Sequence, residues 1–245
     1  MATLDAAVVL VRRKIMDHGT DALGVGEGTT LLIDAMVEEE IAAAVIRYSN
    51  DFPRVVVEDE AGNGTPFYAH TVLASWLDDF SRVIEVEYPA AAVSASHVPE
   101  FLDLADDLEQ DYRTASTRYF RFPNHTPVAS ETIRFRYTAL HTLTNATDTI
   151  PSHHYDAVCD LAAAYCCTRL AARFASSMDS TIAADGTNYR DLSGVWRRMH
   201  DEFMQAYRRK TGLPRSGPLP ASRTADLDVD TSWGGDRMFH PRRWR

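Results

Sequence analysis

The sequence lacks the features that mark several large classes of protein. Its 245 residues include only three cysteines, and no stretch approaches the roughly 18 consecutive apolar residues of a membrane-spanning helix. The first residues do not form a secretory signal, because a short apolar run precedes the basic cluster at residues 12–14. These absences predict a protein that is made and kept in a reducing cytosol and that has no membrane partner.

The three cysteines are too far apart for the usual roles of paired thiols. Cys159, Cys166 and Cys167 fall in one predicted helix. At the rise of an α-helix, the Cα atoms of Cys159 and Cys166 lie about 10 Å apart. A disulfide needs about 7 Å or less, and two thiolates on one zinc ion must lie closer still. All three are therefore predicted to fill the core.

Sequence motifs of catalysis are also missing. The chain has no Walker loop, GxGxxG, GxSxG or HExxH pattern. The glycine-rich GVGEG at residues 24–28 is predicted to be a turn between helices and not a phosphate cradle. The carboxylate pairs Asp78–Asp79 and Asp106–Asp107 have polar neighbours that do not suit a general acid. The sequence therefore favours a protein without catalytic residues or cofactors.

One short segment is the best candidate for binding a metal. It contains His153, His154 and Asp156, followed by Cys159. On a helix, His153 and Asp156 share a face, whereas His154 points about 100° away. One element then offers two ligands, and no partner pair stands out elsewhere. Polar helix-end residues are the favoured interpretation, and a metal-dependent enzyme using His153, His154 and Asp156 is the alternative from another class.

Two segments at the N-terminal end show helical periodicity. Thr3 is a suitable N-cap for a helix over about residues 4–17, and Thr29 or Thr30 for a second helix that ends near Ser49. The second helix has an apolar stripe with the spacing of one helical face. The stripe consists of Ile33, Val37, Ile41, Ala44, Val45 and Tyr48.

From about residue 52 the apolar period changes to two, which is typical of strands. Residues 53–70 predict a hairpin across a Gly/Asn turn, and residues 118–122 predict a strand. Residues 97–113 predict either a helical turn or a loop that leads into a strand. Together with the two strands below, these segments predict four to six short antiparallel strands with one buried face.

Two of the predicted strands, at residues 81–89 and 131–143, have side chains that can be assigned to the two faces of a sheet. In residues 81–89, Ile84, Val86 and Tyr88 are predicted to share one face. In residues 131–143 the predicted buried face holds Ile133, Phe135, Tyr137 and Ala139, and the other face holds Arg134, Arg136 and Thr138.

The helical period returns near Asp148. Ser152 predicts the start of an alanine-rich helix to about Ala175, and small side chains suit a central bundle helix or a subunit contact. A second long helix is predicted from Tyr189 to Thr211, with Gly212 ending it. Its apolar stripe is Leu192, Val195, Trp196, Met199, Phe203 and Ala206. The residues predicted to pack helices or subunits together are Ala163, Cys166, Leu170, Trp196, Met199 and Phe203.

These patterns predict an α+β fold. An N-terminal helical hairpin (1–50) and two long C-terminal helices (149–212) form a helical bundle, with a small antiparallel β insertion (51–148) between them. An extended tail (213–245) without a regular hydrophobic period follows.

Charge is divided unevenly along the chain. Residues 190–245 contain 12 Lys+Arg and 7 Asp+Glu, a net charge of +5. Residues 1–189 contain 13 Lys+Arg and 28 Asp+Glu, a net charge of −15. An acidic body with a basic end predicts contacts between subunits or with an acidic partner. The final residues, MFHPRRWR, combine aromatic side chains with arginine, a composition typical of interface anchors.

The C-terminal half resembles a known family. TIP at 149–151 precedes LAAAYCCTRLAAR at 161–173, then DSTIAADGTNYR at 179–190, a basic helix and HPRRWR at 240–245. This order resembles the head–tail connector proteins of tailed bacteriophages, the adaptor or head-completion family. The likeness covers about residues 75–245. On this resemblance, residues 179–191 are a hinge between two helices.

The resemblance implies a helical-bundle adaptor of the virion neck, made in the host cytoplasm. Such adaptors form a ring, usually of about twelve copies, on the portal protein. The ring meets a stopper or tail-completion protein and extends the channel for double-stranded DNA, which passes without sequence-specific binding. The C-terminal extension inserts into the portal, which maps onto Arg237, Phe239, His240, Arg242, Arg243, Trp244 and Arg245.

Two alternatives remain for the role within a particle. The β insertion of roughly a hundred residues is larger than in minimal adaptors, so a stopper or a tail terminator is a neighbouring possibility. A DNA-packaging accessory that binds duplex DNA through its basic C-terminal segment is the other.

Overall fold

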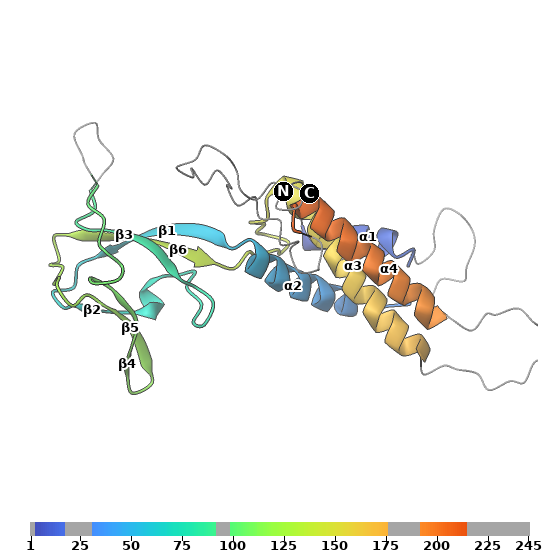
Figure 1. The fold of residues 1–245 in the computed structure, drawn as a ribbon, viewed down its shortest axis with the longest axis horizontal. Coiled ribbons are helices and arrows are strands. Elements are labelled where there is room, and N and C mark those ends of the chain that lie inside the picture. Colours follow the sequence, from blue (N-terminus) through green and yellow to red (C-terminus); the bar gives the residue numbers. More distant parts are fainter. Residues whose placement is uncertain (1–2, 18–30, 92–98, 176–191, 215–245) are drawn as a thin grey trace, which may run out of the picture.

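The helices and the strands of this protein occupy opposite ends of an elongated molecule (Figure 1). The computed structural model describes residues 3–17, 31–91, 99–175 and 192–214. Within these ranges there are four α-helices and two three-stranded antiparallel sheets. The predicted α+β fold, a helical bundle with a small antiparallel β insertion, is confirmed. In the same ranges, no helix is both long and apolar enough to cross a membrane.

The first two helices are α1 (Leu4–Lys14) and α2 (Asp34–Asp51). The predicted cap of α1 is confirmed, because the Ala6 amide donates to Thr3 Oγ1 at 3.2 Å. The predicted start of α2 at Thr29 or Thr30 is wrong. Residues 31–33 are not helical, since the Asp17 carboxylate holds the amides of Leu31 and Leu32 at 2.6 and 3.1 Å.

The apolar stripe of α2 faces the bundle core, with one exception. Ile33 precedes the helix and is 58% exposed, so its inclusion in the stripe is wrong. The other five predicted members are all buried: Val37, Ile41, Ala44, Val45 and Tyr48.

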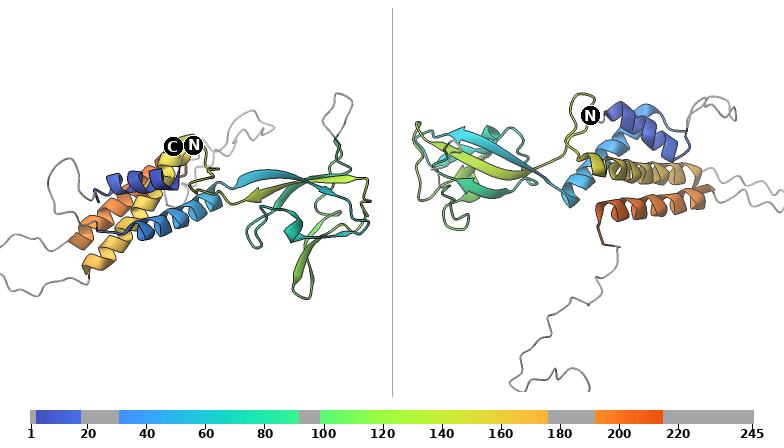
Figure 2. Two further views of the ribbon diagram at one scale, coloured as in Figure 1. Left: turned by 180° about the vertical axis from the view of Figure 1, so that it is seen from behind. Right: turned by 90° about the horizontal axis from the view of Figure 1, so that it is seen from above.

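Helix α3 (Ser152–Ala175) is the centre of the bundle. It contacts all three other helices, and in Figure 2 it lies between α4 (Leu192–Thr211) and the pair α1 and α2. Helix α4 ends at Gly212, which has φ +72°, a conformation that favours glycine after a helix. The predicted end of α4 is therefore confirmed, whereas its predicted start at Tyr189 lies outside the described residues.

The face of α4 that meets the core differs in part from the predicted stripe. Val195 is 40% exposed, so its place in the stripe is wrong. Tyr207, which was not predicted, is only 2% exposed in the core cluster, and its hydroxyl donates to Asp51 Oδ2 at 2.8 Å. A buried phenol needs such a partner, and the sequence pattern alone does not show one.

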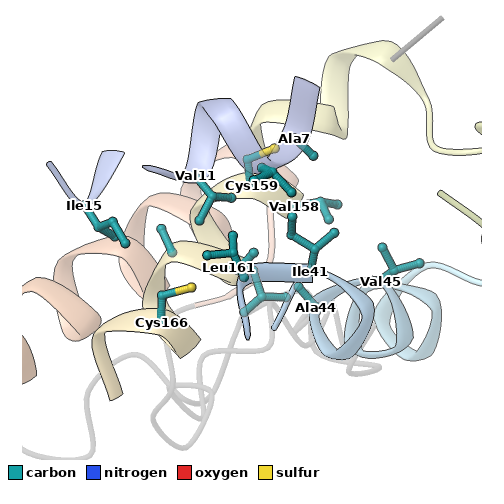
Figure 3. Close-up of a cluster of buried hydrophobic side chains, with 14 of the residues drawn as sticks. Ala7, Val11, Ile15, Ile41, Ala44, Val45, Val158, Cys159, Leu161 and Cys166 are labelled. Atoms are coloured by element: carbon teal, nitrogen blue, oxygen red, sulfur yellow. The ribbon is translucent and has the colours of Figure 1, made fainter. Parts of the chain in front are cut away.

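Small and branched apolar side chains fill the core of the bundle (Figure 3). Side chains from α1, α2 and α3 converge there, among them Val11, Ile41 and Leu161. Cys159, Cys166 and Cys167 are free and buried in the same cluster, so the prediction that they fill the core is confirmed.

Two three-stranded sheets, built from strands between Arg54 and Ala139, form the part of the molecule called the β unit. The first has the order β1 (Arg54–Ala61), β6 (Thr132–Ala139), β3 (Val83–Glu87). The second has the order β2 (Phe67–Ala69), β5 (Thr117–Arg121), β4 (Glu109–Thr114), and the short 3-10 helix η1 (His70–Val72) follows β2.

Strand β6 shows the predicted alternation. Ile133, Phe135, Tyr137 and Ala139 are all buried, and Arg134, Arg136 and Thr138 lie on the other face. The buried face packs on the second sheet, where the rings of Phe120 and Phe135 have centroids 5.3 Å apart. The two sheets therefore share one aromatic-rich core.

The predicted hairpin over residues 53–70 is wrong, because its two strands belong to different sheets. β1 pairs with β6 along its whole length, and β2 pairs with β5. The chain changes sheets at Gly62, whose amide donates to the Glu131 carbonyl at 2.9 Å. A Cβ atom on Gly62 would lie 2.1 Å from the Val128 carbonyl oxygen, so only glycine allows this close approach.

The predicted face of β3 is also wrong in part. The register shifts between Val83 and Glu85, as at a β-bulge, and this breaks the alternation. Val83 and Val86 are therefore both buried, whereas Ile84 is 41% exposed. Of the two readings of residues 97–113, the loop that leads into a strand is correct, since the segment ends in β4.

Candidate assembly surfaces

The residues predicted to pack helices together lie in the bundle core. Ala163, Cys166 and Leu170 on α3 are fully buried within a single chain. On α4, Trp196, Met199 and Phe203 are partly buried and pack against the same cluster. Ala163, Cys166 and Leu170 thus face other helices of their own chain, which leaves no surface of theirs for a neighbouring subunit.

Four charged side chains, here called the ion cluster, join three helices at one end of the bundle. They are Lys14 from α1, Asp156 and Asp160 from α3, and Lys210 from α4. Lys14 Nζ lies 2.7 Å from Asp156 Oδ1 and 2.6 Å from Asp160 Oδ1, and Lys210 binds the other oxygen of each carboxylate. The Asp160 side chain is only 3% exposed, and these two ammonium groups supply the opposite charge that a buried carboxylate needs.

Pairing within the ion cluster shifts the pKa values of two of its members. Burial alone raises the pKa of Asp156, but hydrogen bonds from Lys14 and Lys210 outweigh it and lower the pKa. Burial likewise opposes the charged form of Lys210, and its bonds to Asp156 and Asp160 raise the pKa of that ammonium group. Both groups are thus held in their charged forms at neutral pH.

A second charged network fixes the chain between α1 and α2. The Arg12 guanidinium donates to Asp34 Oδ1 at 3.0 Å, to Asp17 Oδ2 at 2.9 Å and to the Leu32 carbonyl at 2.8 Å. On α3, Arg169 pairs with Glu39 and Glu40 of α2. The sequence predicted no ion pair for any of these residues, and apart from Asp17 their carboxylate partners are more than 20 residues away along the chain.

Aromatic and histidine side chains lie where the bundle meets the β unit. The ring nitrogens of His141 lie 2.8 Å from the Thr149 carbonyl and 3.1 Å from the Phe52 carbonyl. His141 therefore ties the entry of the chain into the β unit to its exit. Burial lowers the pKa of His141. The Tyr48 ring packs against the His141 ring at a tilt of 51°, and the Tyr48 hydroxyl bonds His154 Nδ1 at 2.7 Å.

The three residues of the metal alternative have separate partners. His154 bonds Tyr48, and Asp156 binds the two lysines of the ion cluster. The rings of His153 and His154 are tilted against each other, with centroids 4.2 Å apart. In the described parts of the chain, no three His, Cys, Asp or Glu side chains gather closely enough to hold a metal ion.

The carboxylates of the β unit that lie near histidines are tied to basic and amide groups. A hydrogen bond from His70 lowers the pKa of Asp78, and one from Asn124 lowers the pKa of Asp107. His70 also bonds the Gln110 carbonyl through Nε2 at 2.7 Å, so both of its ring nitrogens are engaged. These contacts link the loop after η1 to β4.

The outer face of the first sheet carries both ion pairs and exposed valines. Arg134 Nε lies 2.7 Å from Asp59 Oδ1, and Arg134 Nη1 lies 2.9 Å from Glu87 Oε2. Beside these charges, Val55 and Val57 on β1 are 47% and 55% exposed. The sequence did not predict this surface, because the three consecutive valines and three consecutive acidic residues of RVVVEDE do not show which face of β1 is exposed.

Two predicted features lie outside the described residues. One is the hinge at 179–191. The other is the C-terminal set predicted to bind the portal, namely Arg237, Phe239, His240, Arg242, Arg243, Trp244 and Arg245. The last described residues after α4 are Gly212, Leu213 and Pro214, so the tail begins at the end of the bundle that holds the ion cluster.

Two solved structures are similar to this chain at a low level. One is described as the neck of an empty gene transfer agent particle with C6 symmetry, and the other as the virion of the native gene transfer agent particle. In each case the identity is 14%, the match covers 80% of this chain and 92% of the other chain, and the TM-score is 0.28. Neither a protein-family model nor a curated protein matches the chain. A TM-score of 0.28 is too low to establish a shared fold or role.

Proposed function

We propose that this protein is a structural subunit of the neck of a phage-like virion, an adaptor that forms a ring on the portal and extends the DNA channel toward the tail. The observation that supports this proposal is the set of ion pairs that join the helices of the bundle. Lys14, Lys210, Arg12 and Arg169 all bind carboxylates on other helices or on the connection between α1 and α2. Such pairing holds elements in place, as a structural subunit requires.

The arrangement of the two units supports a role between two neighbours. The helical bundle and the β unit lie at opposite ends of the molecule and present separate surfaces (Figure 1). His141 fixes the connection between them, because it bonds both Phe52 and Thr149. A protein of this shape can contact one partner through its bundle and another through its β unit.

The charge distribution supports a basic anchor on an acidic body. Residues 190–245 have a net charge of +5, from 12 Lys+Arg and 7 Asp+Glu, in a chain with a net charge of −10. An acidic channel wall repels the phosphates of DNA, which lets DNA slide without binding. Arginine and tryptophan at residues 242–245 suit insertion into a pocket of the portal.

The resemblance of residues 149–173 and 240–245 to head–tail connector proteins supplies the kind of particle. On this proposal the partners are further copies of the chain, the portal, a stopper or tail-completion protein and the passing DNA. The protein is made in the host cytoplasm and resides in the virion neck. A stopper or tail terminator in the same neck is the second candidate, because the β unit is a large insertion into the bundle.

Deleting residues 236–245 tests the portal anchor. We expect the truncated protein to lose binding to portal rings of the same virus in co-sedimentation, while its circular dichroism and melting temperature stay unchanged. The matched control deletes residues 216–225, which shortens the tail but keeps the aromatic and arginine residues at positions 237–245. Equal portal binding by full-length and 236–245-deleted protein would overturn the anchor.

Electron microscopy tests the ring. Portal particles mixed with the full-length protein should show an added ring with the portal's axis of symmetry. A single copy bound at one site, or steep salt-dependent binding to duplex DNA without any ring, would instead favour the packaging accessory.

A further inference from the structure

Strand β1 has an unpaired edge. The hydrogen bond from the Gly62 amide to the Glu131 carbonyl fixes which backbone groups of β1 point toward β6. Because this direction alternates along a strand, the N–H and C=O groups of Val55, Val57 and Asp59 point away from β6. The bond from the Thr138 amide to the Arg82 carbonyl agrees with this, since it runs from β6 to the opposite side.

The edge is also apolar, which is unusual for a strand exposed to water. The side chains of Val55 and Val57 are 47% and 55% exposed on the outer face of the sheet. In the described part of the chain, β1 pairs with β6 alone, and neither valine has a partner strand on the other side. Exposed flat edges of this kind pair readily with another strand.

Arg54 at the start of β1 has no ion pair with a described carboxylate. Arg54 donates to Ser75 Oγ at 3.1 Å, and its Nε is buried without a hydrogen bond to any described residue. Glu58 lies four residues later on the same face, where its carboxylate accepts the Ala74 amide at 2.8 Å. Strand β1 thus has a positive charge at its start, three valines, and a negative charge after them.

This order of charges is complementary to itself when the strand is reversed. In an antiparallel pair of two β1 strands centred on Val56, residues whose numbers sum to 112 lie opposite each other. Arg54 then faces Glu58 of the second copy, and Val55 faces Val57 of the second copy. The outward backbone groups of Val55 and Val57 match in this register and form about four hydrogen bonds. Opposite charges and apolar pairs both favour it.

We propose that two copies of this protein pair through β1 in this antiparallel register, which joins their first sheets into one continuous sheet. The contact is twofold symmetric, so it covers the open β1 edge of both copies at once. Neighbours in a ring of more than two copies are not related by a twofold axis, so this pairing belongs to the free protein before assembly. It is therefore independent of the proposed ring.

Cysteine cross-linking in the full chain tests the register. Val56→Cys places two thiols on the twofold axis, in a pair whose Cα atoms are about 4.5 Å apart and within disulfide range. We expect a disulfide-linked dimer on mild oxidation. Val55→Cys is the matched control, because in this register the Cα atoms of the two copies of residue 55 lie more than about 7 Å apart and their thiols should not cross-link. The double variant V55C/V57C should cross-link again. The native cysteines are buried and do not interfere.

Charge reversal tests the proposed ion pairs. Arg54→Glu and Glu58→Arg each place like charges opposite each other, so each should weaken self-association by about tenfold in sedimentation equilibrium. Mixing the two variants restores both opposite-charge pairs, and we expect a heterodimer as tight as the wild-type dimer. Circular dichroism checks that each variant folds, and the cysteine experiment stands without them.

The possible outcomes separate this proposal from the function proposed above. A wild-type protein that stays monomeric at high concentration, or a Val55→Cys variant that cross-links as well as Val56→Cys, would overturn the β1 pairing. Either result leaves portal binding and ring formation to be judged by their own experiments. Cross-linking at Val56 together with rescue by the mixed variants supports the pairing.

Discussion

Removing both lysines of the ion cluster should destabilise the bundle by more than the sum of the two single changes. Lys14→Met leaves Asp160 paired with Lys210, and Lys210→Met leaves it paired with Lys14. Only the double variant leaves the buried carboxylate without a cation. The largest loss of stability is therefore expected only when the second of the two cations that bind Asp160 is also removed.

The expected loss in the free energy of unfolding follows from how exposed each side chain of the ion cluster is. The Lys14 side chain is 15% exposed, so losing its charge-assisted bonds costs about 2 kcal/mol. Lys210 is 39% exposed, so solvent screens its bonds and its loss costs about 1 kcal/mol. An unpaired carboxylate with 3% exposure, as for Asp160, costs about 3–5 kcal/mol. We therefore expect the double variant to lose about 4–5 kcal/mol, with a coupling of at least about 1 kcal/mol.

Urea unfolding of the four proteins measures the free energies, provided that the transition is two-state. The matched control is Arg13→Met with Arg209→Met, which removes the same charge from exposed neighbouring positions on the same two helices. Each of the two control substitutions should change the free energy of unfolding by less than about 0.5 kcal/mol. Strict additivity of the two lysine changes, or a loss no greater than in the control, would refute the reasoning.

Three further predictions concern the core, the thiols and pH. Ala163→Leu should cost about 1–3 kcal/mol in urea unfolding because position 163 is fully buried, whereas Ala42→Leu on the exposed face of α2 should be neutral. The three cysteines should resist a thiol reagent in the native protein and react together on unfolding, because burial raises their pKa to about 12; rapid native labelling would contradict this. Asp156→Asn should make the free energy of unfolding depend less on pH in acid. The pKa of the Asp156 carboxyl is lowered in the folded protein, so the carboxylate stabilises the fold at pH values above its unfolded pKa of about 3.9, and this stabilisation is lost as the pH falls through the folded pKa. An unchanged acid limb would mean that Lys14 and Lys210 contribute nothing through Asp156.

Periodicity predicted the elements that depend on local pattern. The alternation of Ile133, Phe135, Tyr137 and Ala139 set the buried face of β6, and the limits of α3 followed from Ser152 and the alanine-rich run. Each of these elements buries one continuous face, so its period directly reflects its environment. The cap at Thr3 is also local, since its hydroxyl binds an amide three residues away.

The errors came from contacts that are distant in sequence. The hairpin prediction over residues 53–70 failed because β1 finds its partner in β6, where Val56 lies opposite Tyr137, 81 residues later. The β3 bulge and the buried Tyr207 have the same origin, since each depends on a neighbour in another element. A pattern read along one segment contains no information about such neighbours.

What the sequence determined by itself was the α+β class, the order of helices and strands, and the absence of paired cysteines, because these depend on composition and on short-range periodicity. The tertiary structure decided the remainder. It brought Lys14 and Lys210 to one buried carboxylate, and it left the edge of β1 open with its valines exposed. The physical reason is that charge pairing and strand pairing act across space between residues far apart in the chain, so only the folded arrangement fixes them.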